Sequence, residues 1–145
     1  MSYKITCRVY QTNPNAFFTC VEKVVWNYAN GGSWTMVDDL HVLKMGGSGT
    51  SGTMRFCDLK TGEAFTVTIG VHNYKRWCDI VTNLKPDETA CIIQPQYYSG
   101  SHKDREAVRE SQNMQHSVKN AKGRQIQVNY TQGEGNDMQC NLIIG

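Results

Sequence analysis

The protein has 145 residues, a length that suits one domain with a single hydrophobic core. Its formal net charge is +2 and its acidic and basic residues are mixed, so it lacks the basic patch typical of proteins that bind nucleic acids or membrane surfaces. Mean hydropathy is -0.50, and no apolar run approaches the roughly 18 residues that a membrane span requires.

The N-terminal residues do not resemble a secretory signal, because no basic stretch is followed by an apolar one. This favours a cytoplasmic location, where cysteines stay reduced. The cysteines form no Cys-x-x-Cys pair and do not group with the histidines, so we expect free thiols, several of them in the core, with no bound metal or other cofactor. The cysteines are Cys7, Cys20, Cys57, Cys78, Cys91 and Cys140.

Alternation of apolar and polar residues is the main pattern along the chain, and it predicts half-buried antiparallel strands. It is clearest over residues 4–10, 64–71, 125–130 and 138–144. Turn signals rich in glycine and asparagine separate the segments, for example residues 30–32, 60–62 and 133–137. The sequence therefore predicts an all-β fold, an antiparallel β-sandwich. Further strand candidates are Val21–Tyr28, His41–Met45, Thr53–Cys57 and Ala90–Gln94.

One segment has helical spacing instead. From Asn73 to Leu84, apolar residues fall at positions i, i+3, i+4 and i+7, beginning with Trp77, and Asn73 is a candidate N-cap. Pro86 ends this predicted helix, and the two acidic residues after it suggest the start of a second. Asp104–Gln112 could form a short surface helix. We therefore expect a small helical insertion in the β-sandwich.

The segment Gly47–Gly52 matches the pattern G-x-G-x-x-G, which can bind dinucleotides when a helix follows it. Here residues 53–57 have a strand pattern, so a glycine-rich hairpin loop is the better interpretation. Such a loop still suits a sugar, because a ligand can approach the backbone closely at Gly49 while Ser48 offers a hydroxyl group.

Residues 72–74 are a second candidate contact point. Asn73 carries both a donor and an acceptor, which suits sugar hydroxyls, although from the sequence alone the N-cap role is the better interpretation; the two roles are compatible. His72 and Tyr74 could present ring faces to a sugar or simply pack. Asp79 and Thr82 would share one face of the predicted helix and could hold a sugar, or could be an ordinary polar face. No nucleophile elbow, zinc-protease motif or acid–base pair is present, so an enzyme is disfavoured.

Several of these segments, taken together and in order, resemble the fungal fruit-body lectin family. They run from one end of the chain to the other, with Gly70–Thr82 as the longest. The resemblance implies an actinoporin-like β-sandwich in which a helix-loop-helix joins the sheets, with residues 1–145 as a single lectin domain. The matching segments are Arg8–Thr12, Tyr28–Gly32 with Trp34, Gly46–Gly52, Gly70–Thr82, Gln96–Tyr98 and Asn141–Gly145.

The same resemblance implies a function. Family members are homotetrameric defence proteins that bind Gal-beta-1,3-GalNAc (T-antigen) or N-acetylgalactosamine glycans at one site and, in several members, N-acetylglucosamine at a second. Residues carried over to the first site are Ala29 (backbone), Ser48, Gly49 and Asn73, with His72 and Tyr74 nearby. Those carried over to the second site are Asp79, Ile80 (backbone), Thr82, Arg105 and, in place of a family tyrosine, His116.

A membrane-active, pore-forming protein of the same fold is the main alternative, because fold alone does not determine function. Pore formers of this shape need a free amphipathic helix at the N-terminus. Residues 4–10 alternate as a strand instead, which favours the lectin.

Overall fold

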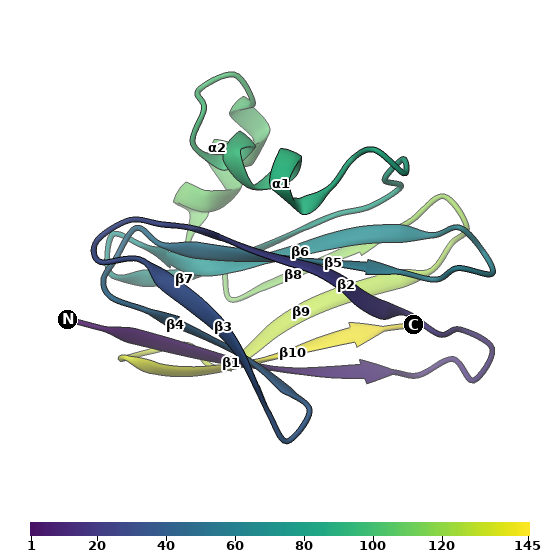
Figure 1. Cartoon of the computed structure of the whole chain (residues 1–145), viewed down its shortest axis with the longest axis horizontal. Helices are drawn as coiled ribbons and strands as arrows, with labels where there is room; N and C mark the ends of the chain where they lie inside the picture. The colour runs from purple at the N-terminus through teal and green to yellow at the C-terminus, as the bar shows by residue number, and fades with distance from the viewer.

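Ten strands form two packed sheets in the computed structural model, which describes residues 1–145 (Figure 1). The β-sandwich predicted from the alternation is therefore confirmed. The six-stranded sheet contains, in spatial order, β3 (Gly32–Val37), β4 (Leu40–Met45), β1 (Tyr3–Gln11), β10 (Asp137–Ile144), β9 (Gln125–Gln132) and β8 (Gln115–Lys119). The four-stranded sheet contains β2 (Thr19–Trp26), β5 (Ser51–Cys57), β6 (Ala64–His72) and β7 (Lys75–Val81).

One strand pair departs from the antiparallel arrangement. β1 and β10 run parallel in the middle of the six-stranded sheet, in a register that extends from Lys4 opposite Asp137 to Gln11 opposite Ile144. The other strand pairs are antiparallel. The first and last strands of the chain are thus direct neighbours.

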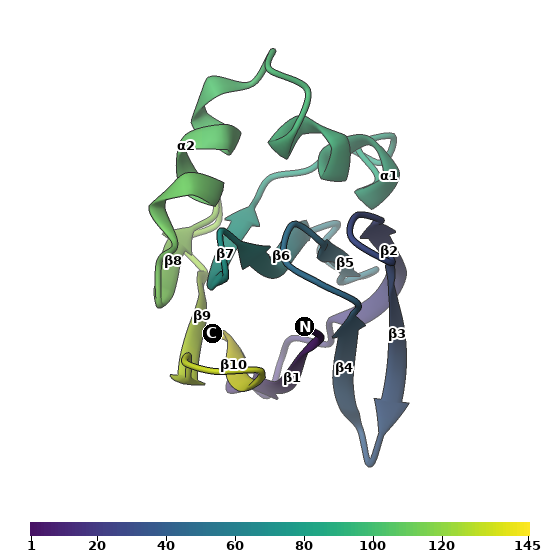
Figure 2. The ribbon, with the colours of Figure 1, turned by 90° about the vertical axis from the view of Figure 1, so that its left-hand side faces the viewer.

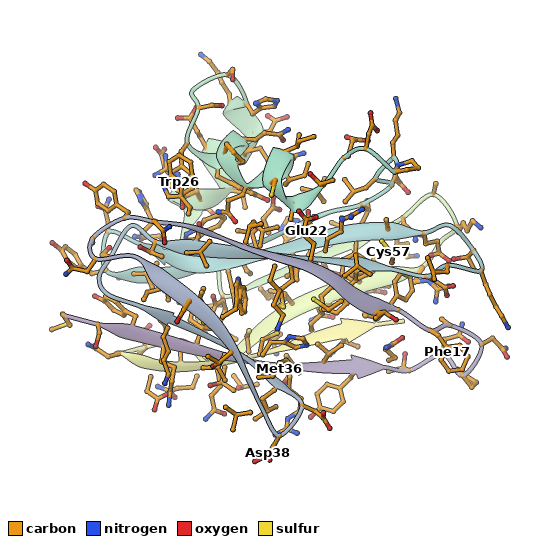
Figure 3. All side chains as sticks on the ribbon, viewed as in Figure 1. Phe17, Glu22, Trp26, Met36, Asp38 and Cys57 are labelled. Carbon is orange, nitrogen blue, oxygen red and sulfur yellow. The ribbon has the colours of Figure 1, made fainter.

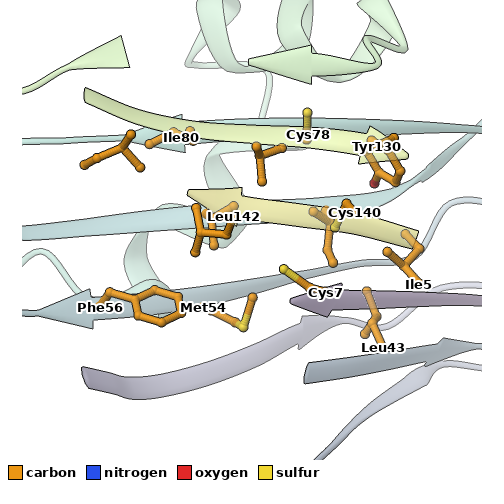
Figure 4. Close-up of a cluster of buried hydrophobic side chains, with 14 of the residues drawn as sticks. Ile5, Cys7, Leu43, Met54, Phe56, Cys78, Ile80, Tyr130, Cys140 and Leu142 are labelled. Carbon is orange, nitrogen blue, oxygen red and sulfur yellow. The ribbon is translucent and has the colours of Figure 1, made fainter. Parts of the chain in front are cut away.

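The main core lies between the two sheets, where alternate residues of the strands point inward (Figure 4). Ile5 and Leu142 from the larger sheet are fully buried, as is Met54 from the smaller one. Phe56 and Phe65 stack with ring centroids 5.3 Å apart. Burial of this apolar surface is the main force holding the sheets together.

A helical segment connects β7 to β8 and so joins the two sheets. It comprises α1 (Ala90–Ile93), the 3-10 helix η1 (Gln94–Tyr97) and α2 (Lys103–Ser111), and it covers the outer face of the four-stranded sheet (Figure 2). Trp77, Leu84, Ile93 and Tyr97 form a second buried cluster there. The central strands of this sheet are therefore buried on both faces.

The helix predicted over residues 73–84 is wrong, because strand β7 occupies most of that segment. Trp77 contacts the helical segment while Cys78 and Ile80 face the main core, so apolar residues occur on both faces of the strand and imitate helical spacing. Asn73 is accordingly not an N-cap. Asn73 and Tyr74 form the β6–β7 turn with φ values of 47° and 68°, the positive angles that two-residue hairpin turns require.

The other helix predictions had mixed outcomes. The surface helix expected over residues 104–112 is confirmed as α2. The strand expected over residues 90–94 is wrong, since α1 lies there, and α1 begins at Ala90 rather than directly after Pro86. Strands β3 and β8 were not predicted; both are edge strands, and β8 contains a single aliphatic residue, Val118.

All six cysteines carry free thiols. Cys7, Cys78 and Cys140 are buried, which confirms that several cysteines fill the core. Burial raises the pKa of the Cys78 thiol well above its ordinary value, so this group stays protonated. None of the helices has the length and apolar character needed to cross a membrane.

Candidate carbohydrate-binding site

A cavity of about 490 Å³ opens at one end of the sandwich, where two loops and the end of β2 meet the helical segment. The β6–β7 turn and the loop between β4 and β5 form two of its sides. Its lining combines aromatic rings with neutral polar groups and a single cation. The lining residues are Trp26, Tyr28, Ser48, Gly49, Val71, His72, Asn73, Tyr74, Tyr98 and Arg109.

The glycine-rich loop between β4 and β5 is shaped by close contacts. The backbone N–H of Gly49 donates to the carbonyl of Val71 at 2.9 Å, and Ser48 Oγ accepts from the backbone N–H of Tyr74 at 2.9 Å. Gly49 has φ of 105°, and a Cβ there would lie 2.4 Å from Cδ1 of Tyr28. Only glycine therefore lets the loop pack against the Tyr28 ring. Strand β5 follows the loop, which confirms the hairpin interpretation.

Aromatic side chains form the opposite side of the cavity. Trp26 stacks on Tyr98, with centroids 4.4 Å apart and planes inclined by 6°. Figure 3 shows Trp26 on the side of the sandwich that carries the helical segment. Tyr28 and Tyr74 are 63% and 76% exposed, so two further ring faces are open to a ligand. Rings exposed in this way can pack against the C–H groups of a sugar.

Arg109 on α2 organises the polar groups of the cavity. Its Nε donates to the carbonyl of Tyr97 at 2.9 Å, and its Nη1 lies 3.1 Å from Nδ1 of His72. Burial, and then the nearby Arg109 charge, lower the pKa of His72. Because Arg109 can only donate, Nδ1 of the neutral His72 ring accepts this bond, and Nε2 lies 3.4 Å from Nδ2 of Asn73.

A second group of polar side chains surrounds Asp79 on β7. Tyr97 donates its hydroxyl proton to Oδ2 of Asp79 at 2.7 Å, and Nε2 of His116 on β8 lies 3.2 Å from Oδ1. Burial raises the pKa of Asp79, whereas the Tyr97 bond and the positive charges nearby oppose this increase. One of those charges is Arg105 on α2, whose Nε donates to Oε1 of Gln96 at 3.1 Å.

Comparison with known proteins determines the family. The model of the fungal fruit body lectin family matches residues 1–142. The chain belongs to the fungal fruit body lectin family. It is 52% identical to Boletus edulis lectin from Boletus edulis over 144 residues, which cover 99% of each chain.

Solved structures agree with this assignment. Wild-type Xerocomus chrysenteron lectin is 54% identical to this fungal fruit body lectin, with a TM-score of 0.95 and full coverage of both chains. A mutated form of that lectin matches with 55% identity and a TM-score of 0.95, covering 100% of this chain and 99% of the other. The protein is thus a carbohydrate-binding lectin, and its family is non-enzymatic, as the sequence predicted.

The structure brings together most of the residues predicted for the first site. Ser48, Gly49 and the three turn residues 72–74 all line the cavity of this fungal fruit body lectin. Ala29 lies beside it, in the β2–β3 turn, with φ of 44° and its carbonyl packed against Gly46 and Gly47. Further lining residues were not predicted: Tyr28 and Val71 adjoin predicted residues in the chain, whereas the others come from distant segments. These further residues are Trp26, Tyr28, Val71, Tyr98 and Arg109.

The residues predicted for the second site are placed less uniformly. Asp79 and His116 are in contact, and Arg105 acts on Asp79 through its charge. Ile80 points into the main core, so only its backbone could reach a ligand. Thr82 follows the end of β7, and the shared helical face predicted for Asp79 and Thr82 does not exist. Tyr97, which was not predicted there, binds Asp79 directly.

Proposed function

We propose that this lectin binds N-acetylgalactosamine-terminated and Gal-beta-1,3-GalNAc (T-antigen) glycans in the 490 Å³ cavity, with residues 1–145 acting as a single lectin domain. The observation that carries the proposal is the position of Asn73 and the Ser48–Gly49 loop beside two exposed tyrosine rings. Arg105 and Asp79 are outside this cavity, so its recognition groups are mostly neutral.

The chemistry of the cavity suits a sugar. The Asn73 amide offers a donor and an acceptor to neighbouring hydroxyls, and the hydroxyl of Ser48 can do the same. Tyr28 and Tyr74 present ring faces to the apolar side of the sugar. Neutral hydrogen bonds with aromatic contacts are what a polyhydroxylated ligand without charge requires.

Asn73→Ala tests the proposal. The substitution removes one or two hydrogen bonds to the ligand, and we expect binding to an immobilised T-antigen glycoprotein to weaken by roughly 1–3 kcal/mol. Asn15→Ala, at an exposed asparagine in the β1–β2 loop, is the matched control and should bind as the wild type does. Unchanged binding by Asn73→Ala would refute the assignment.

A second site for N-acetylglucosamine is part of the proposal and comprises Asp79, the Ile80 backbone, Thr82, Arg105 and His116. It is supported by the cluster of Asp79, His116 and Arg105. The family resemblance places a tyrosine where this chain has His116, whose smaller ring offers less apolar surface to an acetamido methyl group. We therefore propose that N-acetylglucosamine binds more weakly here than in family members with tyrosine.

We further propose that the lectin acts as a homotetramer in fungal defence, with glycoproteins as partners. Several sites on one particle raise avidity for a glycan-bearing surface. Sedimentation at micromolar concentration should show a tetramer, and haemagglutination should accompany it; a strictly monomeric species would contradict this. The pore-forming alternative would need a free amphipathic helix, whereas residues 3–11 form strand β1, which is paired on both edges with β4 and β10.

A further inference from the structure

The C-terminal end of η1 contributes one tyrosine to each of the two proposed sugar sites. Tyr98 lines the cavity and stacks on Trp26. Its neighbour in the chain, Tyr97, donates its hydroxyl proton to Asp79 at 2.7 Å. The position of η1 relative to the four-stranded sheet therefore sets the geometry of both sites.

A layer of buried polar side chains lies between this segment and the sheet. Ser51 and Thr53 project from β5, Thr68 projects from β6, and all three are completely buried. Thr53 and Thr68 are directly opposite each other, with their Oγ1 atoms 2.7 Å apart, and Thr68 is opposite Asp79 on β7. Buried hydroxyls need hydrogen-bond partners, so such a layer favours one position of the covering segment.

Gln94 supplies those partners from the first position of η1, where it is 3% exposed. Its Nε2 donates to Ser51 Oγ at 2.7 Å, and its Oε1 accepts from the hydroxyl of Thr53. Ser51 Oγ in turn lies 2.6 Å from the hydroxyl of Tyr98. The two ends of one amide thus join the cavity side of the layer, at Tyr98, to its Asp79 side, at Thr53 and Thr68.

The residue after Gln94 is Pro95, whose ring restricts the backbone within η1. A displacement of Gln94 would therefore be passed on to the two tyrosines that follow. Arg109 holds the other end of the segment by donating to the Tyr97 carbonyl at 2.9 Å.

We propose that Gln94 is the positioning residue of both sugar sites: it touches no sugar, and it sets the positions of Tyr98 in the cavity and Tyr97 at Asp79. This inference rests on the proposed function for its ligands. It assigns a positioning role to a residue buried beneath the sites, and that role depends on both ends of its amide.

Gln94→Leu is the principal test, because it keeps nearly the same volume while removing both hydrogen bonds. By calorimetry with Gal-beta-1,3-GalNAc and separately with N-acetylglucosamine, we expect about tenfold weaker binding of the disaccharide and roughly threefold weaker binding of the monosaccharide. Near-ultraviolet circular dichroism, which reports the stacking of Trp26 on Tyr98, should change in the unliganded protein.

Two further variants separate positioning from general destabilisation. Ile144→Val trims a buried side chain at the end of the sandwich distant from the cavity, and it should lower the melting temperature while leaving both affinities and the dichroism unchanged. Ser51→Ala cuts the connection from Gln94 to Tyr98 alone. It should weaken disaccharide binding and leave N-acetylglucosamine binding as in the wild type.

Wild-type affinities and dichroism in Gln94→Leu would overturn the inference, as would equal losses of affinity in Gln94→Leu and Ile144→Val. A wild-type protein that binds neither sugar would refute the proposed function. The dichroism measurement needs no ligand, so it would still decide whether Gln94 positions Tyr98.

Discussion

The two proposed sugar sites differ in what their polar groups already bind. In the cavity, the Tyr28 and Tyr74 rings are open to solvent, and Asn73 is exposed. At the second site, the Asp79 side chain is 5% exposed, and each of its oxygens already has a protein partner. A sugar that enters the cavity forms new contacts with exposed groups. A sugar that binds Asp79 has to replace the hydrogen bonds that its carboxylate already makes with Tyr97 and His116. Net affinity at the second site is therefore a difference between two sets of hydrogen bonds, which is small even when each bond is strong.

The largest effect is expected from a substitution that narrows the cavity proposed to bind the disaccharide. In Gly49→Ala, the new Cβ would lie 2.4 Å from the Tyr28 ring, so the ring must move and the loop conformation is strained. We expect disaccharide affinity to fall at least about tenfold in calorimetry, with N-acetylglucosamine binding unchanged.

Gly135→Ala is its matched control, because Gly135 also has positive φ, at 79°, but nothing lies within 4 Å of the added atom. Gly135→Ala should introduce similar backbone strain without lowering the affinity for the disaccharide. Equal affinities for the two variants and the wild type would show that Tyr28 and the loop do not form the sugar site.

An intermediate effect is expected from changing the partner of Asp79. His116→Tyr provides a larger ring and a hydroxyl that can still reach the carboxylate, so we expect N-acetylglucosamine to bind about threefold more tightly. Calorimetry measures this directly. His102→Tyr, at an exposed histidine before α2, serves as the control. If both variants retain wild-type affinity, His116 does not belong to a sugar site.

The smallest effect concerns pH. Burial raises the pKa of Asp79, so its carboxylate takes up a proton at higher pH than an exposed aspartate does, and N-acetylglucosamine affinity should change as pH is lowered from about 8 to about 5. His72 has a lowered pKa, so less of it is protonated in the same range and disaccharide affinity should vary less. Calorimetry of each sugar across this range tests the contrast, and parallel pH profiles for the two sugars would contradict it.

Glu63 provides a check that such profiles report binding and not unfolding. Its hydrogen bonds with Arg124 lower the pKa of Glu63 to about 2. Because the folded pKa lies below the ordinary value of 4.5, this ion pair stabilises the fold fully above that pH and is lost as pH falls toward 2. The melting temperature should thus decline below about pH 4.5, and Glu63→Gln should weaken that decline.

Sequence patterns predicted those parts of the fold in which one face of a strand is buried. Alternation placed β1, β9 and β10 correctly, because their outer faces are polar. It failed for β7, where the helical segment covers the outer face and Trp77 is as buried as Ile80 is on the other side. Periodicity carries no information about a strand that is apolar on both faces.

The residues of the candidate site were likewise predicted only in part. Short segments suffice to indicate Ser48, Gly49 and Asn73, since each lies in a loop or turn with a recognisable composition. Trp26 and Arg109 could not be predicted, because they reach the cavity only through the pairing of β2 with β5 and the packing of α2 against β7. The role of Gln94 could not be predicted for another reason. Its segment was predicted as a strand, which would have left its amide without the partners that η1 gives it.

The parallel pairing of β1 with β10 also bears on how the chain is made. A ribosome synthesises β1 long before β10, yet the two strands form the centre of the larger sheet. Until β10 has been synthesised, one edge of β1 has no partner, while β5, β6 and β7 can already pair through short hairpins. Contacts between such distant parts of the chain slow folding and leave strand edges exposed to aggregation. Completion of the larger sheet therefore has to wait for β10, and until then one edge of β1 is open to pairing with another chain.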